Sequence, residues 1–170
     1  MDARITKIGF GGGCHWCTEA VFQALHGVLK VEQGWIASVN EQSDFSEAVI
    51  VHYNQEDILL KTLIEIHLHT HRSSSNHSMR KKYRSAVYTF SSPQNDKAKA
   101  LISTFQSQFE NKLITEVFPF ESFRPSLDAI QNYYHKNPKK PFCTKYIDPK
   151  LKVLADQFPD QMKHLEKIEI

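Results

Sequence analysis

The stretch ITKIGFGGGCHWCTEAVFQAL, residues 5–25, changes its periodicity in the middle. Residues 5–10 alternate loosely between polar and apolar side chains, as in a β-strand, and the three glycines that follow are typical of a tight turn. After Cys14 the apolar residues follow helical spacing: Cys17, Ala20, Val21, Ala24 and Leu25. The pair His26-Gly27 is a helix stop signal. The sequence therefore predicts a strand, a glycine turn and a helix.

The rest of the chain alternates in the same way. Apolar patterning predicts strands at 28–36, 47–53, 84–90 and 113–118, and helices at 58–67, from Pro93 to about 110, and at 151–158. This order predicts an α+β fold, a two-layer sandwich of the ferredoxin-like, split-βαβ kind. We expect one domain over residues 1–170, with its core at about 5–122 and an irregular, proline-rich C-terminal tail at about 123–170.

Composition and charge exclude several classes of protein. The 170 residues carry 21 basic and 19 acidic side chains, a balance that argues against binding to nucleic acid or a membrane surface. No apolar run is long enough to span a membrane, and the N-terminus lacks the pattern of a signal peptide. Three cysteines are too few and too oddly placed for a secreted disulfide framework, so we expect a cytoplasmic protein.

Cys14 is the first candidate for chemistry. A cysteine at a helix N-terminus faces unpaired N–H groups and the positive end of the helix dipole, which stabilise a thiolate. Cys14 therefore reads as a nucleophile, with a small buried residue at a strand end as the alternative. Cys17 completes a C-x-x-C spacing but lies on the core-facing stripe, so a structural role and a redox role stay equally open for it.

Several separated motifs resemble one family. They are Gly11-Gly12-Gly13-Cys14-His15-Trp16-Cys17-Thr18-Glu19, Val31-Glu32-Gln33-Gly34-Trp35, Ser46-Glu47-Ala48-Val49, Tyr83-Arg84-Ser85-Ala86-Val87-Tyr88, and Gln131, Tyr133, Asn137 and Pro138 ahead of Cys143. In this order they resemble the peptide methionine sulfoxide reductase A family. The resemblance spans about residues 5–143, which makes it specific although each motif alone is weak.

The resemblance implies an enzyme that reduces the S epimer of methionine sulfoxide, free or in proteins. Cys14 would attack the sulfoxide sulfur and become a sulfenic acid, which a second thiol converts to a disulfide. Cys143, on a mobile tail, would be the resolving thiol, with Cys17 as the alternative. Thioredoxin, or dithiothreitol in the test tube, would restore the enzyme, and no metal or organic cofactor is expected.

Two further residues would act on the sulfoxide oxygen. Glu47 shares a strand face with Val49 and Val51, and a carboxyl among apolar neighbours tends to stay neutral and can donate a proton. A solvated carboxylate at a strand entrance is the alternative. Tyr83 stands where the family has a tyrosine that hydrogen-bonds this oxygen; taken alone, it would be a half-buried packing ring.

The substrate-binding residues implied by the resemblance are His15, Trp16 and Trp35, and two of them depart from the family. His15 replaces a Phe that, with the Trp, cages the substrate methyl group, and Trp35 replaces a Tyr. As a cation His15 would favour the Cys14 thiolate; alternatively its ring turns to a backbone partner. Ser78 and Phe142 also replace the family's usual Asp and Tyr, which puts substrate preference in question.

Four histidines and a basic run need separate interpretation. His67, His69, His71 and His77 could ligate a metal together with Cys14 and Cys17, but their spacing fits no strong zinc pattern, so we expect them to line a loop. The basic residues at 80–84 are expected at a solvated loop edge, with anion binding as the alternative. Two alternatives to the reductase stay open: a general thiol oxidoreductase or peroxidase using Cys14 and Cys17, and a non-catalytic module that binds metal or sulfoxide.

Overall fold

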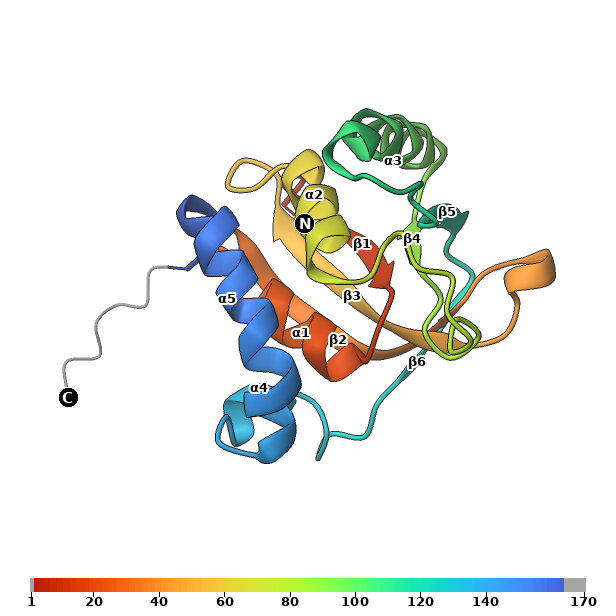
Figure 1. Cartoon of the computed structure of the whole chain (residues 1–170). Coiled ribbons are helices and arrows are strands. Elements are labelled where there is room, and N and C mark those ends of the chain that lie inside the picture. The colour runs from red at the N-terminus through yellow and green to blue at the C-terminus, as the bar shows by residue number, and fades with distance from the viewer. Residues whose placement is uncertain (1, 164–170) are drawn as a thin grey trace.

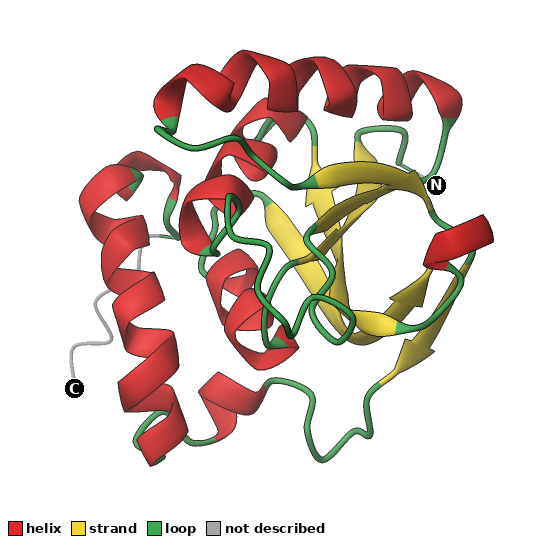
Figure 2. Cartoon of the chain, turned by 45° about the vertical axis from the view of Figure 1, so that its right-hand side comes forward, coloured by secondary structure: helices red, strands yellow, loops and turns green. Residues whose placement is uncertain are grey.

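The computed structural model describes residues 2–163 as a curled sheet with helices packed around it (Figures 1 and 2). The elements in chain order are β1 (Ile5–Gly11), α1 (His15–Gln23), β2 (Val28–Ala37), β3 (Ser46–Asn54), α2 (Leu60–Thr70), β4 (Ala86–Thr89), α3 (Ser92–Phe105), β5 (Glu116–Pro119), β6 (Ser122–Pro125), α4 (Tyr133–Lys136) and α5 (Asp148–Gln157). The α+β class predicted from the sequence is confirmed. None of the helices within these residues is long and apolar enough to cross a membrane.

The sheet holds its six described strands in the order β5-β4-β1-β3-β2-β6. Its pairs are antiparallel except β4 with β5, which is parallel. In the β1–β3 pair Gly11 lies opposite Ala48, and in the β2–β3 pair Trp35 lies opposite Glu47. This register places the end of β1, the start of β3 and the end of β2 side by side. The glycine turn that follows β1 therefore begins next to Glu47.

The two faces of the sheet bury different amounts of apolar surface. The helix-covered face holds the larger core, in which Phe10 of β1 stacks on Phe22 of α1 with ring centroids 4.6 Å apart. The other face holds a small cluster around Ile36, Ile50 and Tyr88, covered partly by phenylalanines of the β4–β6 region. The larger core fixes α1 against β1 and β3, and so fixes the position of the helix N-terminus.

The C-terminal segment differs from the irregular tail predicted from its prolines. It contains β6, α4, a wide helical turn at Cys143–Ile147 and α5, which packs along α1 and α2 (Figure 1). Cys143, Ile147 and Leu154 are fully buried there. Pro125 ends β6, and Pro141, Pro149 and Pro159 lie in the first turns of helical segments, where a missing N–H group costs little, so they do not prevent regular structure.

Element boundaries differ from prediction mainly where apolar patterning is weak. α2 continues to Thr70, so His69 is helical as well as His67, while His71 and His77 lie in the segment that follows the helix. β4 is shorter than predicted: it spans Ala86–Thr89, because residues 78–82 form a turn and residues 84 and 85 have no regular structure. The start of α3 is as predicted: Ser91 caps it by accepting a hydrogen bond from the N–H of Gln94, and Pro93 lies in the first turn.

Candidate active site

The glycine turn holds Cys14 at the first residue before α1. The turn is tightly enclosed, because a Cβ on Gly12 would overlap the ring of His71. Arg80 fixes the same residue from outside the sheet: its Nη1 donates to the Gly12 carbonyl at 3.0 Å and to the Tyr83 carbonyl at 2.9 Å. The guanidinium of Arg80 is therefore occupied by backbone carbonyls, whereas Lys81 and Lys82 are exposed, as expected for a solvated loop edge.

The Cys14 thiol has a lowered pKa. The largest cause is a hydrogen bond from the Cys17 thiol, and the backbone N–H of Trp16 acts in the same direction. Burial and the nearby charge of Glu47 oppose them without reversing the direction. Cys14 is half-buried, so a substrate can still reach its sulfur. Its lowered pKa favours the thiolate form of that sulfur.

The carboxyl of Glu47 lies directly beside the start of α1. Its side chain is only 8% exposed, so Glu47 is not a solvated carboxylate at a strand entrance. Oε1 accepts a hydrogen bond from the backbone N–H of His15 at 3.2 Å, and the ammonium of Lys82 lies 3.7 Å from Oε2. A buried carboxyl thus faces the residue next to the candidate nucleophile.

His15 is buried, and each ring nitrogen has a defined neighbour. Nδ1 lies 2.6 Å from the Gly34 carbonyl, and Nε2 lies 3.4 Å from Glu47 Oε1. The ring meets Trp35 edge-on, with centroids 5.0 Å apart. For Nδ1 the structure therefore has the backbone partner that the sequence left open as an alternative.

Trp16 lies in an aromatic cluster built by the C-terminal segment. Its ring stacks on Tyr133 at 4.1 Å, and Phe142 meets both rings edge-on. Trp35 lies across the site on β2, opposite Glu47. Trp16 and Trp35, both half-buried, thus flank the Cys14–Glu47 pair from two different elements.

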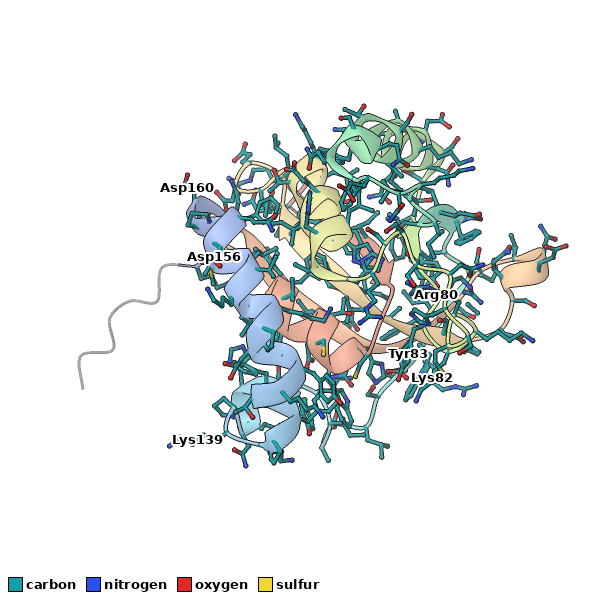
Figure 3. The ribbon with its side chains drawn as sticks, viewed as in Figure 1. Arg80, Lys82, Tyr83, Lys139, Asp156 and Asp160 are labelled. Atoms are coloured by element: carbon teal, nitrogen blue, oxygen red, sulfur yellow. The ribbon has the colours of Figure 1, made fainter. Side chains whose placement is uncertain are left out.

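Tyr83 belongs to the loop between α2 and β4, where Figure 3 shows it beside Arg80 and Lys82. The ammonium of Lys82 lies over the Tyr83 ring, 5.1 Å from its centroid. This loop joins the site through the backbone, because the N–H of Glu47 donates to the Lys82 carbonyl at 3.1 Å. Tyr83 is half-buried and lies on the Glu47 side of the site.

Cys17 and Cys143 lie together in a buried cluster with Ala20 and Ile147, and Cys14 borders this cluster. All three cysteines are thiols in this structure. The pKa of Cys17 is strongly raised, above all by its hydrogen bond to the Cys14 sulfur and by burial. Burial also raises the pKa of Cys143, whose thiol donates to the Asn137 carbonyl. Cys143 is fully buried, so the mobile tail invoked to explain its reach is not observed.

Sequence reasoning missed Glu19, a fully buried carboxylate on α1. Its oxygens accept hydrogen bonds from Gln33 Nε2 at 2.9 Å, from the N–H of Asn132 at 3.0 Å and from the N–H of Tyr133 at 3.1 Å. Glu19 thereby fixes the segment that presents Tyr133 to Trp16. The only signal for it was its place within the family motif, since a charged residue inside a helix is ordinarily exposed.

The histidines do not gather into a metal site. Within residues 2–163, no group of three or more His, Cys, Asp or Glu side chains is arranged to hold a metal ion. His67 stacks between Phe10 and His71, and burial lowers its pKa to about 3. His71 Nε2 lies 2.8 Å from the Ser85 hydroxyl. The His71 ring packs against Gly12 of the glycine turn, and the His67 ring stacks on His71.

Comparison with known proteins gives a consistent assignment. A sequence model described as peptide methionine sulfoxide reductase matches residues 6–162. The peptide methionine sulfoxide reductase MsrA of Trichodesmium erythraeum is 35% identical over 174 residues, covering 93% of this chain and 98% of that protein. Reduced Mxr1 from Saccharomyces cerevisiae has a similar structure (TM-score 0.73, 22% identity, 84% of this chain and 91% of that one). Mxr1 in complex with Trx2 matches with a TM-score of 0.63 at 21% identity, over 78% and 87% of the two chains.

A thiol of lowered pKa near a buried carboxyl is an arrangement that suits a thiol-dependent oxidoreductase. The chain belongs to the peptide methionine sulfoxide reductase family.

Proposed function

We propose that this protein reduces methionine S-sulfoxide, free or in proteins, with Cys14 as the nucleophile. The observation that carries the proposal is the lowered pKa of Cys14 at the head of α1, with the buried carboxyl of Glu47 beside it. The thiolate attacks the sulfoxide sulfur, and the sulfoxide oxygen takes up one proton. Methionine leaves, and Cys14 keeps the oxygen as a sulfenic acid.

Glu47 is the proposed proton donor to the sulfoxide oxygen. Its burial limits contact of the carboxyl with water, and its hydrogen bond from the His15 N–H fixes its orientation toward the head of α1. Tyr83, on the loop attached to Glu47, is the proposed second contact to the same oxygen. The Trp16 and Trp35 rings are the proposed apolar walls for the substrate methyl group.

Cys17 is the thiol best placed to resolve the sulfenic acid. It already hydrogen-bonds the Cys14 sulfur, and the negative Cys14 sulfur is a main cause of its raised pKa. Oxidation of Cys14 to a neutral sulfenic acid removes that cause, so Cys17 becomes easier to ionise at the moment it must attack. The attack forms the Cys14–Cys17 disulfide and releases water. Cys143, in contact with the same cluster, is the alternative resolving thiol.

Thioredoxin is the proposed reductant of the disulfide, with dithiothreitol as its substitute in vitro. The Mxr1 structure solved with Trx2 supports this choice through the shared fold. Cys14 is the most exposed of the three thiols, so its sulfur is the proposed point of attack. The cycle is carried by cysteine sulfur and protons and calls for no metal or organic cofactor. A reducing compartment such as the cytoplasm fits this use of free thiols.

The test is reduction of each purified epimer of methionine sulfoxide with dithiothreitol or thioredoxin, with methionine as the measured product. The wild-type protein is expected to reduce the S epimer, and Cys14→Ser to form no methionine. Cys17→Ser is expected to form one methionine per protein but to recycle slowly with thioredoxin, whereas Cys143→Ser should recycle normally. The opposite pattern would assign resolution to Cys143. Thiol oxidation without turnover of either epimer would favour a general thiol oxidoreductase or peroxidase.

A further inference from the structure

The His15 side chain is held between two strands, and its environment determines where its protons lie. Its side chain is 6% exposed, and Nδ1 lies 2.6 Å from the carbonyl oxygen of Gly34 on β2. A carbonyl only accepts hydrogen bonds, so Nδ1 carries a proton and donates it. The ring is thereby fixed with Nε2 toward Glu47 on β3, at 3.4 Å from Oε1.

This contact requires one more proton. A neutral ring with its proton on Nδ1 presents a lone pair at Nε2, and an ionised carboxyl presents lone pairs at Oε1. Two acceptors that face each other at 3.4 Å in a buried site repel. A single proton between them, on Nε2 or on Oε1, converts this repulsion into a hydrogen bond or an ion pair.

We infer that His15 is a positioning residue that keeps a proton at Glu47 for delivery to the sulfoxide oxygen. The inference rests on the proposed function and deepens it. When the Cys14 thiolate attacks, the single proton shared by His15 Nε2 and Glu47 passes through Oε1 to the sulfoxide oxygen, which leaves Glu47 ionised. His15 ends neutral with its Nδ1–H still bonded to Gly34, and one proton from water restores the pair. The sum is thiolate plus sulfoxide plus one proton, giving sulfenic acid plus methionine.

The charged groups around this pair are compatible with the role. Lys82, from the loop before β4, lies 3.7 Å from Glu47 Oε2, the oxygen that His15 does not face. The Cys14 thiolate lies one residue before His15 and favours a retained positive charge nearby. From β2 the ring meets Gly34 and the uncharged Trp35. The pair thus has a hydrogen-bond acceptor at Gly34 on one side, and on the other side Glu47 Oε2 lies near the exposed Lys82 ammonium.

Two substitutions separate proton holding from packing. His15→Phe keeps a ring of similar shape, and His15→Asn keeps a short donor toward the Gly34 carbonyl, but neither carries a proton toward Glu47. At saturating methionine S-sulfoxide, both should lose about tenfold or more in single-turnover rate near pH 8 and much less near pH 6, where bulk protons reload Glu47. The falling limb of the rate–pH profile should therefore move to lower pH in both variants. A uniform loss at every pH, or a wild-type profile in either variant, would overturn the inference.

A second measurement needs no variant to be active. Nitrogen NMR of the His15 ring in wild-type protein, assigned by comparison with His15→Phe, reports which nitrogen is protonated. We expect the Nδ1–H form to persist at high pH, with the second proton at Nε2 sensitive to Glu47→Gln. A neutral ring protonated only on Nε2 would contradict the inference. Sulfoxide reduction by the wild-type protein would stand in that case, so the two failures are distinguishable.

Discussion

The positions of Cys14 and Glu47 are determined by backbone pairing of the strands. The position of the aromatic cluster beside them depends on side-chain contacts from a distant part of the chain. The first pair lies where β1 ends and β3 begins, and the strand register alone brings these ends together. The aromatic cluster on Trp16, in contrast, depends on residues 132–143, which reach α1 through the buried contacts of Glu19.

The difference predicts two kinds of failure. A change at Cys14 or Glu47 removes a chemical group from a frame that stays folded, because the strands around it pair through their backbones. A change in the Glu19 contacts leaves the chemical groups in place but loosens the segment that carries Tyr133 and Cys143. Chemistry and stability should therefore respond to different substitutions.

The largest expected effect is on the reaction rate, and it comes from a substitution at Glu47. Glu47→Gln keeps the acceptor for the His15 N–H but cannot donate a carboxyl proton, so the single-turnover rate should fall by about 10²–10⁴-fold. The free energy of unfolding should change little. Glu32→Gln is the matched control, because Glu32 also contacts a histidine, His52, at 2.6 Å but lies outside the site. Unchanged turnover in Glu47→Gln would make Tyr83 the proton donor.

The same contrast explains what the sequence could predict. Local sequence patterns, which act over a few residues, predicted the glycine turn and the helix after it. The alternation of residues in β3 predicted the strand face on which Glu47 lies. The contacts of Glu19 with Asn132 and Tyr133 join positions more than a hundred residues apart, and no local pattern specifies such a partner. Proline content likewise predicted an irregular tail: apolar patterning indicated the helix at 151–158, but its packing on α1 and α2 depends on residues far away in the sequence. The position of the His15 ring was also not predictable, because it depends on contacts with Gly34 on β2 and Glu47 on β3.

The next effect should be on stability. Glu19→Ala removes the acceptor of three buried donors, and it should lower the free energy of unfolding by about 3 kcal/mol. Urea unfolding measures this loss. Glu65→Ala is the control, since Glu65 also accepts a side-chain hydrogen bond, from Gln108, but at the surface of α2. If the two variants lost equal stability, the attachment of residues 132–143 would rest on the aromatic stack and not on Glu19.

The smallest expected effect lies where the two regions meet, at Cys17. The Cys17 thiol is the largest cause of the lowered pKa of Cys14, so Cys17→Ala should raise that pKa. The pH dependence of iodoacetamide alkylation at Cys14, followed by mass spectrometry, should then shift to higher pH, and the reaction near neutral pH should slow. Cys17→Ser should recover part of the shift, because a hydroxyl can still donate to the thiolate, and Cys143→Ser should leave the curve unchanged. If Cys17→Ala matched the wild-type curve, the N–H groups at the head of α1 would be sufficient to hold the thiolate, and Cys14 would depend on the backbone alone, as Glu47 does.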